Sequence, residues 1–437
     1  MANVFDYLNW RGDLSFAQDP PNEVDALVFS GLSYIRFGAV ADQYPLHPVS
    51  LKEAAKSFFA LESYETCCRV EKDLDLLHAA AATVRYGNVQ LCMYRDALIP
   101  EQETQFAAMT FLLDDGSMFL AFRGTDNSLV GWKEDFNMTF QQTIPAQRLA
   151  LQYVREVAME HYRPMRLGGH SKGGNLAVFA AARSSPMIQE RILEVFNNDG
   201  PGFTKYLMGD PGYVAMVPKI RTCVPQSSVI GMLLEHEEPY TVIRSKSIGL
   251  LQHDLYTWDV MGKKFIPVEE ITEGSQFVDA TMKTWFADMT NQEREQLVDV
   301  MFALLGSGGA ENVYDLLHPK NIRTYIKTLS SDVNLRRVLS TEFNGLIEAA
   351  RRTKAKFDEN REAQLLLVYI CLIVVARFTF CPFGKVDGQI QPLLFDPALI
   401  FPPRINLIPL VYLLDYLIAG EAVLNTVGNT AMFIPIG

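Results

Sequence analysis

The chain has 437 residues, of which 49% are hydrophobic and 21% charged, so it is long enough for two or three folding units with a sizeable core. Its 39 basic and 51 acidic residues give a net charge of −12, and a surface of that sign repels phosphate backbones, so we expect no nucleic-acid partner. The first residues lack the basic-then-apolar pattern of a secretory signal, and the six cysteines lack the density and spacing of a disulfide or zinc framework. These features predict a cytosolic protein with reduced thiols.

The first part of the chain mixes short apolar runs with turn signals, among them the Asp-Pro-Pro-Asn run at residues 19–22. A helical spacing of apolar residues follows at residues 51–61. We expect residues 1–87 to form an N-terminal segment that packs on a larger core.

In the middle of the chain, short apolar strands alternate with amphipathic helices. The predicted strands are residues 89–94, 106–113, 118–122, 165–168, 192–196, 221–224 and 240–243. The predicted helices are residues 146–162, 175–183 and 213–220. Alternation at this spacing is typical of a parallel sheet covered on both faces, so we predict an α/β fold with a mostly parallel sheet for residues 88–260.

The third predicted region, residues 261–437, is almost entirely helical in pattern from 277 to 352. A Gly-Ser-Gly-Gly loop at residues 306–309 interrupts this pattern. Because the loop follows a helix rather than a strand, it indicates a helix C-terminus and not a phosphate-binding loop.

Two apolar runs lie near the C-terminus, at residues 365–376 and 405–414. Both are shorter than the roughly 18 uncharged residues that a membrane span needs. We interpret them as buried helices of a helical C-terminal region. Contact with a membrane surface is the alternative, because a basic cluster at residues 351–356 would suit an anionic leaflet.

The strongest chemical signal is the Gly-His-Ser-Lys-Gly run at residues 169–173, a G-x-S-x-G pattern between a short strand and a helix. A nucleophile at the tip of so sharp a turn has strained backbone angles, and neighbouring side chains would collide, so glycines flank it. The turn exposes the hydroxyl and directs the N-terminus of the next helix toward a developing oxyanion. A glycine-rich turn at a helix end is the plain structural alternative, but the flanking elements favour Ser171 as a nucleophile.

A nucleophilic serine needs an imidazole base, and in this type of fold the order along the chain is serine, acid, histidine. Three histidines follow Ser171. His318 precedes a proline in the helical region, which suggests a role at a helix end, and His236 lies in a run of glutamates, which indicates a solvated turn. His253 lies in a loop after the last predicted strand, where the base belongs, so we predict it as the base.

Asp199 is the candidate acid that orients the histidine. It follows the strand at residues 192–196, and functional groups collect at the carboxyl ends of strands in open α/β sheets. The alternative is an aspartate that only forms a turn or caps a helix.

Two backbone N–H groups should stabilise a tetrahedral intermediate, one of them from Lys172, directly after the nucleophile. The other is expected from the loop after an earlier strand, and the Phe-Arg-Gly-Thr-Asp run at residues 122–126 is the candidate. Losing one such donor would cost about 3 kcal/mol of transition-state stabilisation.

The Phe-Arg-Gly-Thr run at residues 122–125, then Trp132 and Asp135, then the Gly-His-Ser-Lys-Gly-Gly run at residues 169–174 resemble the class 3 (fungal-type) lipases. This resemblance implies an α/β-hydrolase-type fold, with Ser171 as the nucleophile and with Thr125 and Lys172 lining the oxyanion hole. Residues 5–13 and the Asn-Asp-Gly-Pro-Gly-Phe run at residues 198–203 are more similar to a bacterial lipase-like family of unassigned function. The resemblance covers roughly residues 1–260.

The chain departs from the class 3 pattern in two places. Class 3 lipases place their acid one strand later, but the comparable loop at residues 224–231 has no carboxylate. The acid is then Asp199, a placement that resembles pancreatic-type lipases; otherwise Glu235 or Glu237 serves, or the triad is incomplete. Lys172 replaces the usual leucine, and it adds either a cation that favours anionic head groups or a solvated lysine on the first helical turn.

Together these residues predict a serine hydrolase of carboxylic esters, with lipid-like acyl esters as substrates. Metal-binding motifs are missing from the sequence, and we expect no metal or organic cofactor. The alternative is a binding or scaffold protein that kept the hydrolase fold without turnover, since the later loop lacks its acid.

Overall fold

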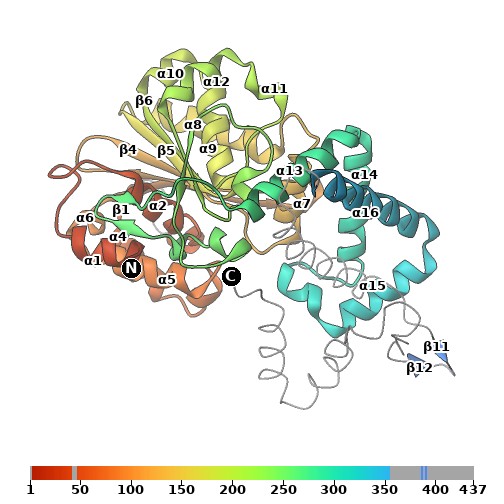
Figure 1. Ribbon diagram of the computed structural model, residues 1–437. Coiled ribbons are helices and arrows are strands. Elements are labelled where there is room, and N and C mark those ends of the chain that lie inside the picture. The colour runs from red at the N-terminus through yellow and green to blue at the C-terminus, as the bar shows by residue number, and fades with distance from the viewer. Residues whose placement is uncertain (1, 42–46, 355–384, 387–388, 391–437) are drawn as a thin grey trace.

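A computed structural model describes residues 2–41, 47–354, 385–386 and 389–390 (Figure 1). Its centre is an eight-stranded sheet in the order β1-β2-β3-β4-β5-β6-β7-β8. Strands β1 to β4 pair antiparallel, whereas β4 to β8 pair parallel. The strands are β1 (Val49–Ser50), β2 (Gln90–Ile99), β3 (Thr104–Leu112), β4 (Met118–Phe122), β5 (Met165–His170), β6 (Ile192–Asn198), β7 (Ile220–Pro225) and β8 (Tyr240–Ile243). The predicted α/β fold with a mostly parallel sheet is confirmed.

Strand β4 is apolar and buried along its whole length because helices cover both faces of the sheet. In β4, Phe119 and Ala121 belong to one buried cluster, and Leu120 and Phe122 belong to a second. Successive residues of a strand point to opposite faces, so these clusters are the two cores of one layered molecule. Helix α2 (Glu23–Leu32) packs on one face, and α9 (Lys172–Arg183) packs on the other (Figure 1).

The remaining helices of the sheet-containing part are α1 (Val4–Arg11), α3 (Gly38–Ala41), α4 (Leu51–Phe59), α5 (Glu71–Ala81), α6 (Val84–Gly87), α7 (Leu129–Asn137), α8 (Pro145–Glu160), α10 (Pro186–Arg191), α11 (Lys205–Met208) and α12 (Pro211–Met216). Three of them, α4, α8 and α12, were predicted from the spacing of apolar residues, as was α9. Helices α1, α2, α5 and α7 were not predicted. The nine residues from Val24 to Leu32 are buried on all sides, so α2 shows no amphipathic period in its sequence.

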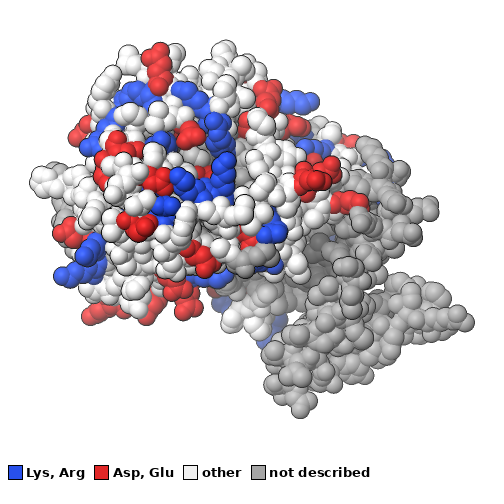
Figure 2. Space-filling model, turned by 60° about the vertical axis from the view of Figure 1, so that its left-hand side comes forward, with Lys and Arg blue, Asp and Glu red and all other residues white. Residues whose placement is uncertain are grey.

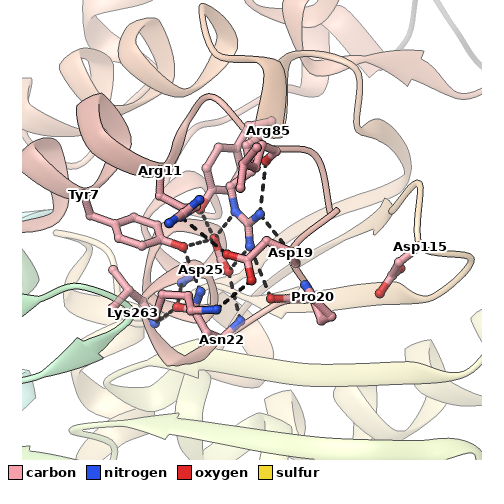
Figure 3. Close-up of polar contacts among 12 residues, drawn as sticks. Tyr7, Arg11, Asp19, Pro20, Asn22, Asp25, Arg85, Asp115 and Lys263 are labelled. Atoms are coloured by element: carbon pink, nitrogen blue, oxygen red, sulfur yellow. Dashed lines mark hydrogen bonds and ion pairs between the residues drawn. The ribbon is translucent and has the colours of Figure 1, made fainter. Parts of the chain in front are cut away.

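A buried ion pair holds the N-terminal segment together (Figure 3). The Asp25 carboxylate accepts hydrogen bonds from Arg85 Nε at 2.8 Å and from Arg85 Nη2 at 2.6 Å, and neither side chain is exposed. Asp25 also accepts from the hydroxyls of Tyr7, at 2.8 Å, and Tyr86, at 2.5 Å. With the Asn22 N–H, at 2.9 Å, five donors on one carboxylate compensate for its removal from water.

The same segment contacts a hairpin that follows the predicted catalytic histidine. This hairpin consists of β9 (Val260–Met261) and β10 (Lys264–Phe265). Lys263, in its turn, lies with Nζ 2.6 Å from Asp19 Oδ1 (Figure 3). The Phe265 N–H donates to Glu23 Oε1 at 2.7 Å. Residues near the two ends of the sheet-containing part are therefore joined directly.

The helical region contains α13 (Glu273–Asp288), α14 (Asn291–Gly306), α15 (Pro319–Ser331) and α16 (Val333–Lys354), as its sequence pattern predicted. Helix α14 ends at Gly306, where the predicted glycine-rich loop begins. This region reaches the sheet part through α7, because Leu129 packs in one cluster with Val298 and Phe302. The Leu129 N–H also donates to the Glu311 carbonyl at 2.9 Å.

No helix in the described part of the chain is long and apolar enough to cross a membrane. The apolar runs at residues 365–376 and 405–414 lie outside the described residues, so their interpretation stays a prediction. Strands β11 (Lys385–Val386) and β12 (Gln389–Ile390) form a small hairpin. The four cysteines in the described ranges are free thiols.

On the face turned forward in Figure 2, lysine and arginine side chains lie among aspartates and glutamates. Several of the basic side chains are paired on the sheet part, as in Arg95–Glu156 at 2.5 Å and Arg166–Glu194 at 3.4 Å. The absence of a nucleic-acid partner stays a prediction from net charge.

Candidate active site

Ser171 stands between the end of β5 and the start of α9, as its motif predicted. Its φ of 59° and ψ of −135° are strained for a residue with a side chain. A Cβ at Gly173 would lie 2.1 Å from the Phe122 carbonyl oxygen, and one at Gly169 would lie 2.3 Å from the Gly173 carbonyl carbon. The two glycines therefore permit the tight turn that holds Ser171 at the carboxyl edge of the sheet.

The side chains of Asp199 and His253 form a hydrogen-bonded pair. Asp199 follows β6 with a φ of 55°, and its N–H donates to the Cys223 carbonyl at 2.8 Å. His253 Nδ1 lies 2.6 Å from the fully buried Asp199 Oδ2. Because a carboxylate accepts, Nδ1 carries the hydrogen and Nε2 keeps its lone pair, which is the tautomer of a general base.

The second oxygen of Asp199 is held by a serine that sequence reasoning missed. Ser228 Oγ donates to Asp199 Oδ1 at 2.5 Å and accepts the N–H of Gly231 at 3.1 Å. Ser228 lies in the loop at residues 224–231, which was noted for lacking a carboxylate. The loop contributes a hydroxyl instead. Nothing in a single serine of the sequence could have indicated this contact.

Neither alternative acid lies in that position. Glu235 and Glu237 are exposed, whereas His253 bonds Asp199. The expectation that His236 is solvated is wrong, because its Nδ1 lies 3.0 Å from Glu238 Oε1 and its Nε2 lies 2.8 Å from the Gly231 carbonyl. His318 is the N-cap of α15, and its Nδ1 accepts the Lys320 N–H, in agreement with the predicted role at a helix end.

A second histidine, His170, holds the loop that carries His253 in place. The rings of His170 and His253 lie 4.5 Å apart, and His170 Nε2 is 2.7 Å from the His253 carbonyl oxygen. Since a carbonyl only accepts, His170 Nε2 donates, and His170 Nδ1 accepts the Tyr34 hydroxyl at 2.9 Å. Burial lowers the pKa of His170 well below the usual range of a histidine, so it stays neutral. The result is a fixed support for the loop that carries His253.

The predicted oxyanion residues lie close to Ser171: Lys172 follows it in the chain, and a Cβ at Gly124, next to Thr125, would lie 3.2 Å from the Ser171 Cβ. Thr125 follows the end of β4, and its Oγ1 donates to Asp135 Oδ2 on α7. Lys172 is the first residue of α9. The first N–H groups of an α-helix have no partner within the helix, and the helix dipole adds positive charge there. These positions suit two donors to an oxyanion.

Both expectations for the Lys172 side chain are wrong, because it is neither solvated nor available to a head group. It is completely buried, with Nζ 3.0 Å from Glu134 Oε2 and 3.0 Å from the Gln105 carbonyl oxygen. Glu134 in turn accepts the N–H groups of Gln105, at 2.9 Å, and Ala146, at 2.8 Å. A lysine in this position is tolerated because α7 places a carboxylate against it.

No cluster of three or more histidine, cysteine, aspartate or glutamate side chains that could hold a metal ion occurs in the described ranges. The expected absence of a cofactor stays a prediction.

The sheet, the serine at its carboxyl edge and the bonded Asp199–His253 pair define a lipase-like α/β-hydrolase-type fold. The chain belongs to the Mbeg1-like family, whose model matches residues 80–303, just over half of its length. This match supports the predicted lipase-like kinship, but not the narrower class 3 assignment.

Two solved structures share a weak likeness with the chain. The lipase of Rhizomucor miehei, in a structure described as a native propeptide complex, is 13% identical over 50% of this chain and 67% of its own, with a TM-score of 0.31. Lipase II of Rhizopus niveus is 13% identical over 51% of this chain and 80% of its own, with a TM-score of 0.30. No curated protein sequence matches the chain.

Proposed function

We propose that the protein is a serine hydrolase of carboxylic esters, with lipid-like acyl esters as its substrates. The observation that carries the proposal is the 2.6 Å contact between His253 Nδ1 and a buried Asp199. Asn198, the residue before Asp199, accepts the N–H of Ser171 at 3.0 Å, and Ser171 has strained backbone angles at a strand-to-helix turn. A carboxylate, a correctly tautomerised imidazole and a strained serine are the three parts of nucleophilic acyl transfer.

In the proposed reaction each of these residues has one role. His253 Nε2 accepts the Ser171 hydroxyl proton while Oγ attacks the ester carbonyl carbon. The N–H groups of Thr125 and Lys172 stabilise the oxyanion of the tetrahedral intermediate. Collapse of the intermediate breaks the ester bond, and His253 gives its proton to the departing alcohol. A water activated by the same histidine then hydrolyses the acyl-enzyme and regenerates Ser171.

Apolar side chains near the base support a lipid-like substrate. The loop that ends in His253 exposes Ile248, Leu250 and Leu251, which are 65%, 60% and 67% exposed. Trp132, on α7 beside the Thr125 loop, is 44% exposed. Large apolar groups exposed together mark surfaces that contact apolar ligands. The class 3-like arrangement of the motifs agrees with this choice.

A fluorophosphonate probe tests the proposal, because it reacts with a serine only when that serine is activated. We expect the wild type to label and to hydrolyse a panel of p-nitrophenyl acyl esters, and Ser171→Ala to do neither. Ser185→Ala is the matched control, since Ser185 is exposed and makes no side-chain cap bond. A folded wild type that neither labels nor turns over would favour the binding or scaffold alternative.

A further inference from the structure

Four side chains from three elements meet beside the predicted oxyanion hole. Thr125 follows β4, Glu134 and Asp135 lie on α7, and Lys172 begins α9. Lys172 Nζ lies 3.0 Å from Glu134 Oε2 and 3.8 Å from Asp135 Oδ1. Asp135 Oδ2 accepts the Thr125 hydroxyl. The cluster therefore links the residue after the nucleophile to the loop that would supply the other oxyanion donor.

Asp135 depends on Lys172 more than on any other charge. Its Oδ1 is buried without a hydrogen-bond partner, so the Lys172 ammonium is the group that compensates this oxygen. Burial of the Asp135 side chain, of which 28% remains exposed, raises its pKa to about 6, and the charge of Lys172 limits that rise. Glu134 raises the pKa further, whereas the Thr125 hydroxyl and His253 lower it. Tyr34, across the site, also interacts with Asp135.

We propose that the Lys172 side chain is a positioning residue of the oxyanion hole, which keeps Asp135 ionised so that Asp135 holds the Thr125 hydroxyl and fixes this donor loop. The inference rests on the proposed hydrolase function. Lys172 then has two roles. Its backbone N–H donates to the oxyanion, and its ammonium group fixes the Thr125 loop through Asp135.

The physical reason is the strength of the Thr125–Asp135 bond. A hydroxyl bonded to an ionised carboxylate is about twice as strongly held as one bonded to a neutral group. When Asp135 is protonated, this charge assistance is lost, and the Thr125 loop is held less firmly. We therefore expect the Thr125 donor of the oxyanion hole to be held less firmly as the pH falls through about 6.

Two variants shift this titration in opposite directions. Lys172→Met removes the cation, which raises the pKa of Asp135. The acid limb of the kcat/KM profile, the fall in activity toward low pH, should therefore move up by about 1 pH unit, the usual effect of an opposite charge at this distance. Glu134→Gln removes the neighbouring anion, so the acid limb should move down. A purely structural role would lower kcat in both variants without opposite shifts.

Asp135→Asn gives the matched control. Asparagine still offers an oxygen to Thr125 but does not titrate, so Lys172→Met should produce no shift of the acid limb in this background. All variants need the neutral His253 as base. The effect of Lys172→Met with Asp135 present, compared with its effect in Asp135→Asn, therefore reports on Asp135 alone. Should Lys172→Met fail to fold, the double variant Lys172→Met/Glu134→Gln removes the buried pair together, which is often neutral for stability. It should still raise the limb, because Lys172 affects Asp135 more strongly than Glu134 does.

The experiment combines pH profiles from 5 to 9 with fluorophosphonate labelling at pH 8. Labelled enzyme with opposite shifts in the two single variants, abolished by Asp135→Asn, supports the inference. Labelled enzyme whose acid limb does not move overturns this inference alone. Wild type that fails to label overturns the proposed function and this inference together.

Discussion

Ser228→Ala tests whether Ser228 holds Asp199, the acid of the predicted triad, in place through the oxygen that does not contact His253. Ser228 is 2% exposed, donates to Asp199 Oδ1 at 2.5 Å and accepts the Gly231 N–H at 3.1 Å. The alanine variant leaves a buried carboxylate oxygen and a buried amide each short of one partner. A hydrogen bond to a charged group contributes about 1.5–3 kcal/mol and a neutral one about 1 kcal/mol, so we expect unfolding to become easier by about 3 kcal/mol.

The effect on rate should be much smaller than the loss of the acid itself. His253 keeps its bond to Asp199 Oδ2 in this variant, so its tautomer is preserved. If about 1.4 kcal/mol of the lost energy is felt in the transition state, kcat falls about tenfold. Urea unfolding measures the stability, and hydrolysis of a short p-nitrophenyl ester measures the rate.

Ser227→Ala is the control, because its hydroxyl contacts only Thr272 Oγ1, at 3.2 Å, at an exposed position. We expect a change in stability within about 0.5 kcal/mol. The reasoning would be refuted by a Ser228→Ala variant as stable as the control. A loss of kcat as large as that caused by removing the acid would also refute it, since Ser228 would then do more than hold Asp199.

Three further outcomes are expected. Asp199→Asn should lower kcat about 10⁴-fold, as the equivalent change does in a serine protease, while Glu235→Gln, in an exposed turn, should leave kcat unchanged; the reverse order in ester hydrolysis would move the acid to the later loop. Arg85→Met should destabilise the fold by about 3–5 kcal/mol in urea unfolding, because it leaves the buried Asp25 carboxylate without its cation; a loss below 1 kcal/mol would contradict the ion-pair argument. From the length of the apolar run at residues 365–376, we predict that the full chain is recovered in the supernatant without detergent. Recovery of the full chain in a carbonate-washed membrane pellet, with a chain ending at residue 354 remaining in the supernatant, would contradict this prediction.

The parts of the molecule that sequence predicted well are those whose signal is local. Strand β4 is five buried residues in a row, and the turn at Ser171 needs its two glycines whatever surrounds it. Asp199 and His253 were predicted from the rule that functional groups follow strand ends, and the structure brings them into contact. Their catalytic roles stay a prediction.

The parts that sequence missed depend on partners far along the chain. Lys172 was expected either to favour an anionic head group or to be solvated, and its partner Glu134 is 38 residues away. Ser228 is 29 residues from Asp199, and no pattern joins the two. Helix α7, which supplies Glu134 and Asp135, was not predicted, although Leu129, Trp132 and Phe136 recur at helical spacing. Such contacts follow from the tertiary fold and not from local spacing.

The contact between Asp19 and Lys263 has a consequence for how the protein folds. It joins residues 244 positions apart, and Glu23 meets Phe265 across 242 positions. Contacts of such long sequence separation form late and slow folding, because the chain entropy of closing the loop is lost before the contact is gained. We therefore expect the β9–β10 hairpin to take its final place only after the first segment of the chain has docked. Refolding should then restore the sheet before it restores the proposed esterase activity, and the lag between the two would measure the closure of this long-range contact.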